Sequence, residues 1–323
     1  MILTPLLRRA ACRTLLLLAA AWATGAQAAE ASCPPPPVPL TAEQVHAGMR
    51  NARDHGFLWR LRRDGVTSYL YGTVHVARLA WMFPGPRVQA ALKAVDTIAL
   101  ELDPLDADIQ RRLAEGMALR AGTEYPEPLR TRMAQRLQLE CLPETAFEQM
   151  GPEMQIALLT ITAARRDGLE AAYGIDMFLA GFARGLNKPV VSLETPEEQL
   201  RAILMPDPGD ALAVVDAGLA ELEAGRARPT LLRVAQVWAD ADIDTLMRYD
   251  DWCECRRSEA EAAVMKRLLD DRNPLLADRI EALHARGKPL FAAIGSLHMV
   301  GPLGLPALLA QRGFVVDRVE YTR

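Results

Sequence analysis

Two short motifs of the same form, each ending in histidine, contain the residues in this chain best suited to chemistry. Gly72-Thr73-Val74-His75 and Gly295-Ser296-Leu297-His298 share the pattern Gly-x-x-His. The chain has five histidines in all, so two in matched contexts indicate a shared role. Two imidazoles and a carboxylate form a minimal ligand set for a divalent metal that keeps coordination positions open for water and substrate. We therefore predict that His75 and His298 are metal ligands.

Each motif directly follows an apolar segment that is typical of a buried β-strand. Residues 69–71 precede the first motif, and residues 289–294 precede the second. Glu101 and Glu194 lie at the ends of two further predicted strands. Ligands of open α/β sheets bind outside the carboxyl ends of the strands, and neighbouring strands lie only ~5 Å apart. We therefore expect these histidines and carboxylates to converge at one edge of a sheet.

The carboxylate of Glu101 is predicted to be a third metal ligand or the general base. A metal ion held in this way would lower the pKa of its bound water and polarise a substrate carbonyl. Strand alternation puts Asp103 on the same face, so Asp103 is the alternative acid. A metal-free alternative uses His75 as the base, Glu101 to orient it, and Ser296 or Thr73 as nucleophile or hydrogen-bond donor.

The elements that position these residues predict an α/β fold, with a mostly parallel central sheet flanked by helices. Alternating residues on both sides of Asp64-Gly65 indicate a β-hairpin, and the strand, helix and strand that follow form a βαβ unit. From about 200 to 271 only helical periodicity is found, which indicates a helical insert or cap. The predicted strands are 57–62, 66–71, 97–103, 188–193, 289–294 and 314–316.

Residues 1–28 have the pattern of a secretory signal peptide. Three arginines precede the apolar run 15–23, and Ala26-Gln27-Ala28 forms a small-x-small cleavage site. The apolar run is well short of the ~20 residues that a membrane-spanning helix needs. Residues 29–40 are predicted to be a proline-rich linker, and 41–323 a single domain. The mature protein is therefore expected in the periplasm or outside the cell.

The charge balance argues against nucleic acid as a partner. The formal net charge is −4, and removal of the signal peptide, with three arginines and no acidic residue, changes it to −7. No block of basic residues remains in the mature chain. It also has no apolar segment of the length that a membrane span requires.

The cysteines predict one disulfide in an exported protein. Cys141 is expected to pair with Cys253 or Cys255, because the latter two are separated by one residue and are expected to be too close to bridge each other.

In their order along the chain, these features resemble the TraB/GumN family, which includes the animal Wnt-cleaving Tiki proteins. The resemblance spans nearly all of the mature chain. The matching segments are Tyr71–His75, Leu100–Asp103, Tyr173–Asp176, Lys188–Thr195, Arg272–Asn273 and Gly295–Gly301.

The resemblance implies a fold of two related halves, akin to erythromycin-esterase and ChaN-like proteins. It also implies an active site formed by the two Gly-x-x-His motifs and the glutamate. Tiki-like members are regarded as metal-dependent proteases that prefer manganese or cobalt. The positions carried over to this chain are Gly72, His75, Glu101, Gly295 and His298, with Arg272 and Asn273 as catalytic supporting groups.

The sequence therefore predicts an exported hydrolase that uses a divalent metal (Mn, Co or Zn), most simply a peptidase with a peptide or protein substrate. Two alternatives stay open. The imidazoles could instead bind haem or a metal, as in ChaN-like relatives, or the site could be that of a metal-free, esterase-type hydrolase.

Overall fold

A six-stranded sheet lies at the centre of the fold in this computed structural model, which describes residues 33–120, 124–253, 255–256 and 259–321. The predicted signal peptide, 1–28, lies outside the described residues. The strand order is β4-β3-β5-β2-β1-β6. The strands are β1 (Phe57–Arg63), β2 (Val66–Thr73), β3 (Thr97–Leu100), β4 (Val190–Ser192), β5 (Leu290–Gly295) and β6 (Val315–Arg318).

The sheet is mostly parallel, as the sequence predicts. Strands β4, β3, β5 and β2 run parallel, and β1 and β6 add an antiparallel edge. The β1–β2 hairpin turns at Asp64 and Gly65, whose φ angles of 50° and 76° fit the left-handed turn that such hairpins favour. Strand β5 comes late in the chain but pairs with both β2 and β3. The second Gly-x-x-His motif therefore begins between the end of β2 and the end of β3.

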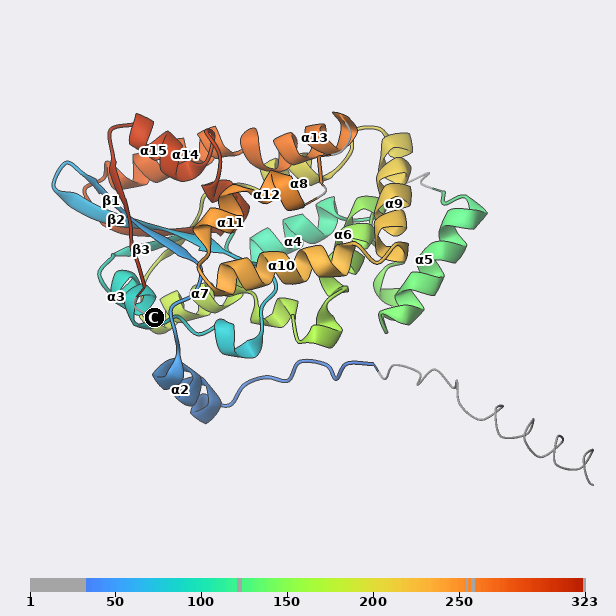
Figure 1. Ribbon diagram of the computed structural model, residues 1–323, viewed down its shortest axis with the longest axis horizontal. Coiled ribbons are helices and arrows are strands. Elements are labelled where there is room, and N and C mark those ends of the chain that lie inside the picture. Colours follow the sequence, from blue (N-terminus) through green and yellow to red (C-terminus); the bar gives the residue numbers. More distant parts are fainter. Residues whose placement is uncertain (1–32, 121–123, 254, 257–258, 322–323) are drawn as a thin grey trace, which may run out of the picture. The chain divides into compact units, whose positions relative to one another are not determined.

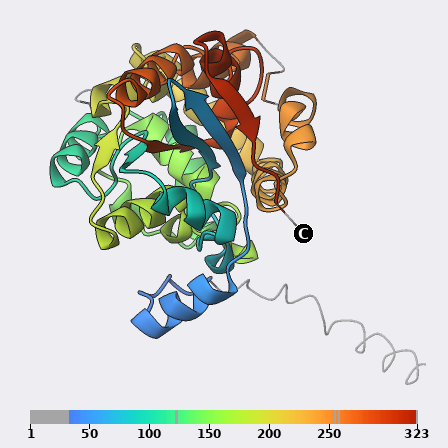
Figure 2. The same cartoon turned by 90° about the vertical axis from the view of Figure 1, so that its left-hand side faces the viewer.

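Helices cover both faces of the sheet. Figures 1 and 2 show α3 and α7 on one face, and α14 and α15 on the other. The helices are α2 (Ala42–Asn51), α3 (Pro86–Lys93), α4 (Ala107–Gly116), α5 (Glu127–Leu139), α6 (Pro152–Thr162), α7 (Ile175–Gly185), α8 (Pro196–Ile203), α9 (Pro208–Glu223), α10 (Ala227–Ala239), α11 (Ile243–Met247), α12 (Tyr249–Trp252), α13 (Glu259–Met265), α14 (Asn273–His284) and α15 (Leu305–Gln311).

Helices α5, α6 and α9 enclose a hydrophobic core of their own, separate from the core of the sheet. Met133, Leu159 and Leu219, one from each helix, are among its buried residues. Residues 200–271 form helices and connecting turns wherever the structure describes them. Helix α10 joins this helical region to the sheet, because its buried Trp238 donates Nε1–H to the carbonyl oxygen of Gly72 at 2.7 Å.

The cysteine pairing differs from the prediction. Cys253 and Cys255 form a disulfide with each other, so Cys141 bonds to neither. The Cα atoms of Cys253 and Cys255 lie 5.1 Å apart, which is within the usual range for disulfides. Their separation by one residue was therefore the wrong reason to exclude this bridge.

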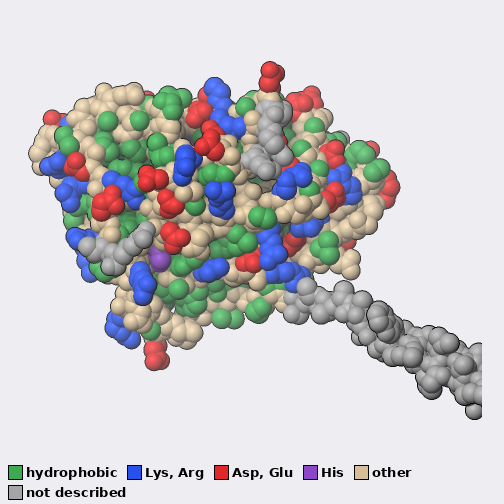
Figure 3. All heavy atoms as spheres, viewed as in Figure 1, with side chains coloured by type: hydrophobic (Ala, Val, Ile, Leu, Met, Phe, Trp, Pro, Cys, Tyr) green, Lys and Arg blue, Asp and Glu red, His purple; other side chains and the backbone are tan. Residues whose placement is uncertain are grey.

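The surface of the described region carries both signs of charge. Figure 3 shows acidic and basic side chains interspersed on one face. Among the described helices, none combines the length and the apolar character needed to cross a bilayer.

Candidate active site

The predicted site residues lie where the parallel strands end. His75 follows β2, Glu101 follows β3 and His298 follows β5 in a short 3-10 turn. Glu194 follows β4, and its backbone N–H donates to the carbonyl oxygen of Glu101 at 2.9 Å. The two Gly-x-x-His motifs also contact each other directly, since Ser296 Oγ of the second motif donates to the backbone carbonyl oxygen of Thr73 in the first, at 2.8 Å.

Glu101 lies between the second motif and the helices that follow the sheet. One of its oxygens accepts from the backbone N–H of Gly295 at 2.7 Å, and the other accepts from Arg272 at 2.6 Å and Gln199 at 3.2 Å. A side chain at Gly295 would place its Cβ 3.3 Å from the first oxygen. Burial raises the pKa of Glu101, but positive charges lower it further, to about 2: those of Arg272, of His75 and of His298, which is protonated at the low pH where Glu101 titrates. Glu101 is therefore ionised.

His298 is buried and neutral. Its Nδ1 lies 2.6 Å from Oδ1 of Asn273, whose Nδ2 donates to the carbonyl oxygen of Leu303 at 2.8 Å. That second bond fixes the amide orientation, so Nδ1 of His298 carries the proton and Nε2 is left with its lone pair. Arg272 approaches this Nε2 at 3.2 Å. Burial lowers the pKa of His298 to about 4.

His75 lies in the same motif as His298, but it is exposed and its partner is a carboxylate. Its side chain is 68% exposed, and its Nδ1 lies 2.9 Å from Oδ2 of Asp176, at the start of α7. The hydroxyl of Thr73 donates to the other oxygen of Asp176 at 2.8 Å. The hydrogen bond to Asp176 raises the pKa of His75 to about 9. His75 is therefore protonated at neutral pH.

Arg272 is the centre of the charged network. Its Nε and Nη2 donate to the two oxygens of Glu194 at 2.9 and 2.5 Å, and Nη2 also donates to Glu101. Burial raises the pKa of Glu194 despite this bond. A π-helical turn, Lys266–Asp270, directly precedes Arg272, and the carbonyl oxygen of its Leu268 accepts from Nη1 at 3.0 Å. Such turns occur often at functional sites.

Some predicted roles do not agree with these contacts. Asp103 is bound by Arg184 at 3.1 and 2.7 Å and contacts neither histidine. The hydroxyls of Ser296 and Thr73 are engaged in the bonds described above, and Ser296 and Thr73 are both buried. Asp176 rather than Glu101 orients His75. The metal-free scheme predicted from the sequence is therefore wrong about the residue that orients His75, and its other roles stay predictions.

Three residues of the site have no role assigned to them by the sequence, although Glu194 is predicted to lie at the same edge of the sheet. Two of them could have been identified from the sequence. Asp176 ends the family-like segment Tyr173–Asp176, and Glu194 lies at the end of a predicted strand. Gln199 could not, because its role depends on the start of α8. There Thr195 and Glu198 form a capping box, and the first turn carries Gln199 toward Glu101.

The donor set suits a divalent metal in its chemistry. Within the described ranges, no three His, Cys, Asp or Glu side chains are grouped around one point as ligands. The guanidinium of Arg272 accounts for this, since it binds Glu101 and faces Nε2 of His298. Both imidazoles nevertheless have Nδ1 bound by a side-chain oxygen, which is how metal-binding histidines are usually oriented. The residue types and the imidazole orientations are therefore those that a metal site would use, while in this structure Arg272 supplies the positive charge beside Glu101.

Comparisons with known proteins agree with the arrangement of motifs. The model of the TraB/PrgY/gumN family matches residues 57–318. The chain is 29% identical over 250 residues to the protein YbaP of Shigella flexneri, covering 75% of this chain and 87% of that protein. It is 28% identical over 249 residues to YbaP of Escherichia coli K12, with the same coverage. No solved structure matches significantly. Because the family model covers most of its length, this chain belongs to the TraB/PrgY/gumN family.

Proposed function

We propose that this protein is an exported, metal-dependent hydrolase that acts on peptides. The observation that carries the proposal is the matched orientation of the two imidazoles. His75 and His298 each have Nδ1 bound by a side-chain oxygen at 2.9 and 2.6 Å, so Nε2 is the nitrogen that each would offer to a ligand, and in His298 this requires Arg272 to give up its 3.2 Å contact. Glu101 adds an ionised carboxylate beside them.

The metal would be held by Nε2 of His75, Nε2 of His298 and the carboxylate of Glu101. A bound divalent ion supplies a polarised carbonyl and a water of lowered pKa. Metal binding needs a neutral imidazole, which His298 already offers and His75 reaches by giving up its proton. Asp176 would then hold the His75 ring in place through the remaining Nδ1–H.

Arg272 would stabilise the negative charge that develops on the substrate carbonyl oxygen. Its guanidinium lies beside His298 and Glu101, and donors fixed in advance are the most effective for this task. The two bonds from Glu194, at 2.9 and 2.5 Å, keep the guanidinium at the site when Glu101 changes partner. Glu194 is therefore a positioning residue.

One observation favours a second candidate, a metal-free hydrolase. The pKa values of the two histidines are displaced in opposite directions, to about 9 for His75 and about 4 for His298. Such a separation is the usual mark of an acid and a base in one site. In this scheme His298 takes a proton from water at Nε2, His75 donates one to the leaving group, and Arg272 binds the carbonyl oxygen.

The test is peptide cleavage by the purified mature chain, read by mass spectrometry on a mixed peptide library. The protein is first depleted of metal and then assayed alone and with Mn²⁺, Co²⁺ or Zn²⁺. Bound metal is measured by elemental analysis in the wild type, His75→Ala and His298→Ala. His46→Ala, which changes an exposed histidine of α2, is the matched control.

Cleavage that needs added metal and is lost in both site variants supports the proposal. Cleavage that survives a chelator favours the metal-free scheme. Metal that is retained equally by the wild type and both site variants contradicts the ligand set. Stoichiometric metal without cleavage of any peptide contradicts the hydrolase and indicates a metal-binding protein.

Export is the remaining part of the proposal. It rests on residues 1–28, whose sequence has the three parts of a signal peptide. Fractionation of cells that express the full chain tests it. A processed protein in the periplasm or medium is expected, and an unprocessed protein in the cytoplasm contradicts it.

A further inference from the structure

We propose that a cavity beside the His75 loop binds a carboxylate, with the apolar atoms next to it, at one end of the peptide substrate. The inference rests on the proposed function for the identity of the ligand as substrate. Anion binding is inferred from the residues that line the cavity and does not depend on hydrolysis. Carboxylate binding can therefore be measured without turnover.

The cavity has a volume of about 420 Å³ and lies between the loop after β2 and helix α10. Its apolar lining comes from Trp81, Leu169, Leu232 and Ala235, and its polar lining from Arg78, Asp167, Arg233 and Gln236. Leu169 and Ala235 are buried, so they form a fixed floor. The cavity therefore offers an apolar base with charged groups around it.

Two guanidinium groups at this cavity lack a carboxylate. Arg78 lies over the ring of Trp81, 5.0 Å from its centroid, and Arg233 lies 4.3 Å from the ring centroid of Trp252. Both side chains are exposed, and neither guanidinium donates a hydrogen bond or forms a close ion pair within the part of the chain that the structure describes, although the charge of Arg78 helps to lower the pKa of Asp167. Stacking on an indole holds a guanidinium in place and leaves its N–H donors available. Both arginines can therefore bind an anion.

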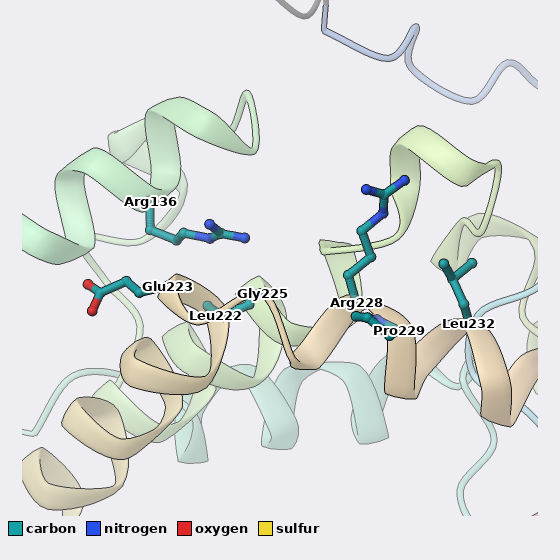
Figure 4. A pocket seen from close by; sticks show the side chains of 7 residues that line it. All are labelled: Arg136, Leu222, Glu223, Gly225, Arg228, Pro229 and Leu232. Atoms are coloured by element: carbon teal, nitrogen blue, oxygen red, sulfur yellow. The ribbon is translucent and has the colours of Figure 1, made fainter.

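A second cavity shows the contrast. It has about 430 Å³ and is also bordered by two arginines, Arg136 and Arg228 (Figure 4). There each arginine has a carboxylate partner, because Arg136 binds Glu140 at 2.7 Å and Arg228 binds Asp167. The positive charge of the cavity in Figure 4 is therefore already balanced. Of these two cavities, the one with Arg78 and Arg233 has guanidinium groups that no carboxylate binds directly, beside an apolar floor.

The carboxylate cavity is close to the candidate active site. Arg78 follows His75 by three residues, so their Cα atoms are at most about 11 Å apart. The loop between them is fixed, since Ala77 pairs with Glu170 through two backbone hydrogen bonds of 3.2 and 3.0 Å. About three residues of an extended peptide, at ~3.4 Å per residue, would span this distance. A substrate can therefore reach both places at once.

The chemistry of the cavity selects a single carboxylate rather than a more highly charged group. Asp167 borders the cavity as a fixed negative charge, which Arg228 binds at 2.7 Å and on which the charge of Arg78 also acts. A group with two or more charges would meet this carboxylate. A peptide can supply the single carboxylate from its C-terminus or from an acidic side chain.

The test is calorimetric binding of three short probes to the mature protein. N-acetyl-Leu-Phe has a C-terminal carboxylate, N-acetyl-Leu-Phe-amide has none, and N-acetyl-Leu-Glu-amide has one on its side chain. Each is titrated into the wild type, into Arg78→Gln/Arg233→Gln, and into Arg60→Gln/Arg286→Gln, which removes the same charge from exposed arginines elsewhere.

We expect at least one carboxylate probe to bind the wild type and the control about tenfold more tightly than the amide, which corresponds to one charge-assisted hydrogen bond. The Arg78→Gln/Arg233→Gln variant should lose this preference. The carboxylate probe that binds more tightly shows whether the cavity prefers a peptide C-terminus or an acidic side chain. Equal binding of acid and amide, no binding of any probe at about 10 mM, or an unchanged preference in the variant overturns the inference.

The binding result and the hydrolysis result are independent. Carboxylate binding without peptide cleavage would contradict the proposed function and keep the anion site. Peptide cleavage without a preference for carboxylate probes would support the proposed function and contradict the anion site. If both hold, the Arg78→Gln/Arg233→Gln variant should raise KM for acidic peptides and leave kcat unchanged.

Discussion

The two Gly-x-x-His motifs place equivalent histidines at strand ends and give them opposite properties. His75 is exposed and is paired with a carboxylate, which raises its pKa to about 9. His298 is buried and is paired with an amide, and burial lowers its pKa to about 4. The motif therefore determines where the imidazole lies, whereas the partner of Nδ1 and the degree of burial determine its charge.

The difference follows from the positions of the strands. Strand β5 pairs on both sides, with β2 and β3, so the turn that follows it is enclosed. The two motif glycines reflect this packing. A Cβ on Gly72 would lie 2.9 Å from Oγ of Ser296, and one on Gly295 would lie 3.3 Å from Glu101. The absence of a side chain at Gly72 thus leaves room for Ser296 of the second motif, and its absence at Gly295 leaves room for the carboxylate of Glu101.

Removal of each imidazole should give the largest contrast. Both His75→Ala and His298→Ala should reduce peptide cleavage more than about 100-fold. Only His298→Ala should destabilise the fold, by about 3 kcal/mol, because it leaves the buried amide of Asn273 without its partner and creates a cavity. His75→Ala should change the free energy of unfolding by less than about 0.5 kcal/mol, since the side chain is exposed. Urea unfolding measures this, and equal destabilisation by both variants would contradict the comparison.

Replacement of the carboxylate partner should make His75 resemble an ordinary histidine. Asp176→Asn should bring the pKa of His75 down from about 9 toward its usual value, because the charged hydrogen bond is lost. Cleavage should fall about 10- to 100-fold, as for other groups that orient metal-binding histidines. NMR titration of the imidazole protons in metal-free protein measures the pKa. Asp108→Asn, on the exposed surface of α4, is the control, and an unchanged His75 in Asp176→Asn would exclude the pairing.

The fold could be predicted well from the sequence because its signals are local. Each of the six predicted strands is present, and the Asp-Gly turn closes the expected hairpin. The place of β5 between β2 and β3 could not be predicted, because strand order depends on packing between segments about 190 to 220 residues apart. That order is what brings the second motif next to both His75 and Glu101.

The site could be predicted only in part. Alternation was applied to both Glu101 and Asp103, but β3 ends at Leu100, so the alternation no longer holds beyond it. The family resemblance names Arg272 as a supporting group, but its carboxylate partners could not be predicted, because its bonds to Glu101 and Glu194 span 171 and 78 positions of the chain. Periodicity identifies strand ends. It carries no information on which arginine fills the space between them.

A smaller loss of stability should follow from removing a hydrogen bond that holds only the first motif. Trp238→Phe removes the 2.7 Å hydrogen bond from α10 to the carbonyl oxygen of Gly72. We expect a loss of about 2 kcal/mol in the free energy of unfolding, since a buried carbonyl loses its partner. The pKa of His298 should not change, because its partners, Asn273 and Arg272, lie at the start of α14 and directly before it. Urea unfolding and NMR titration test this, and a shifted His298 would mean that the two motifs are coupled through their contact.

The dependence of stability on pH should separate the two histidines with the smallest effect. The pKa of His75 is raised in the folded protein, so its contribution is complete below pH ~6.5 and is lost as the pH rises to about 9. The pKa of His298 is lowered, so stability declines as the pH falls from ~6.5 to about 4. His75→Gln should therefore flatten only the alkaline limb of a plot of urea midpoint against pH in metal-free protein, and His298→Gln only the acid limb. The alkaline change should be the weaker one, because solvent screens the exposed pair of His75 and Asp176. If either variant flattened both limbs, the two imidazoles would titrate as one coupled group, and the separation of acid and base between the motifs would be wrong.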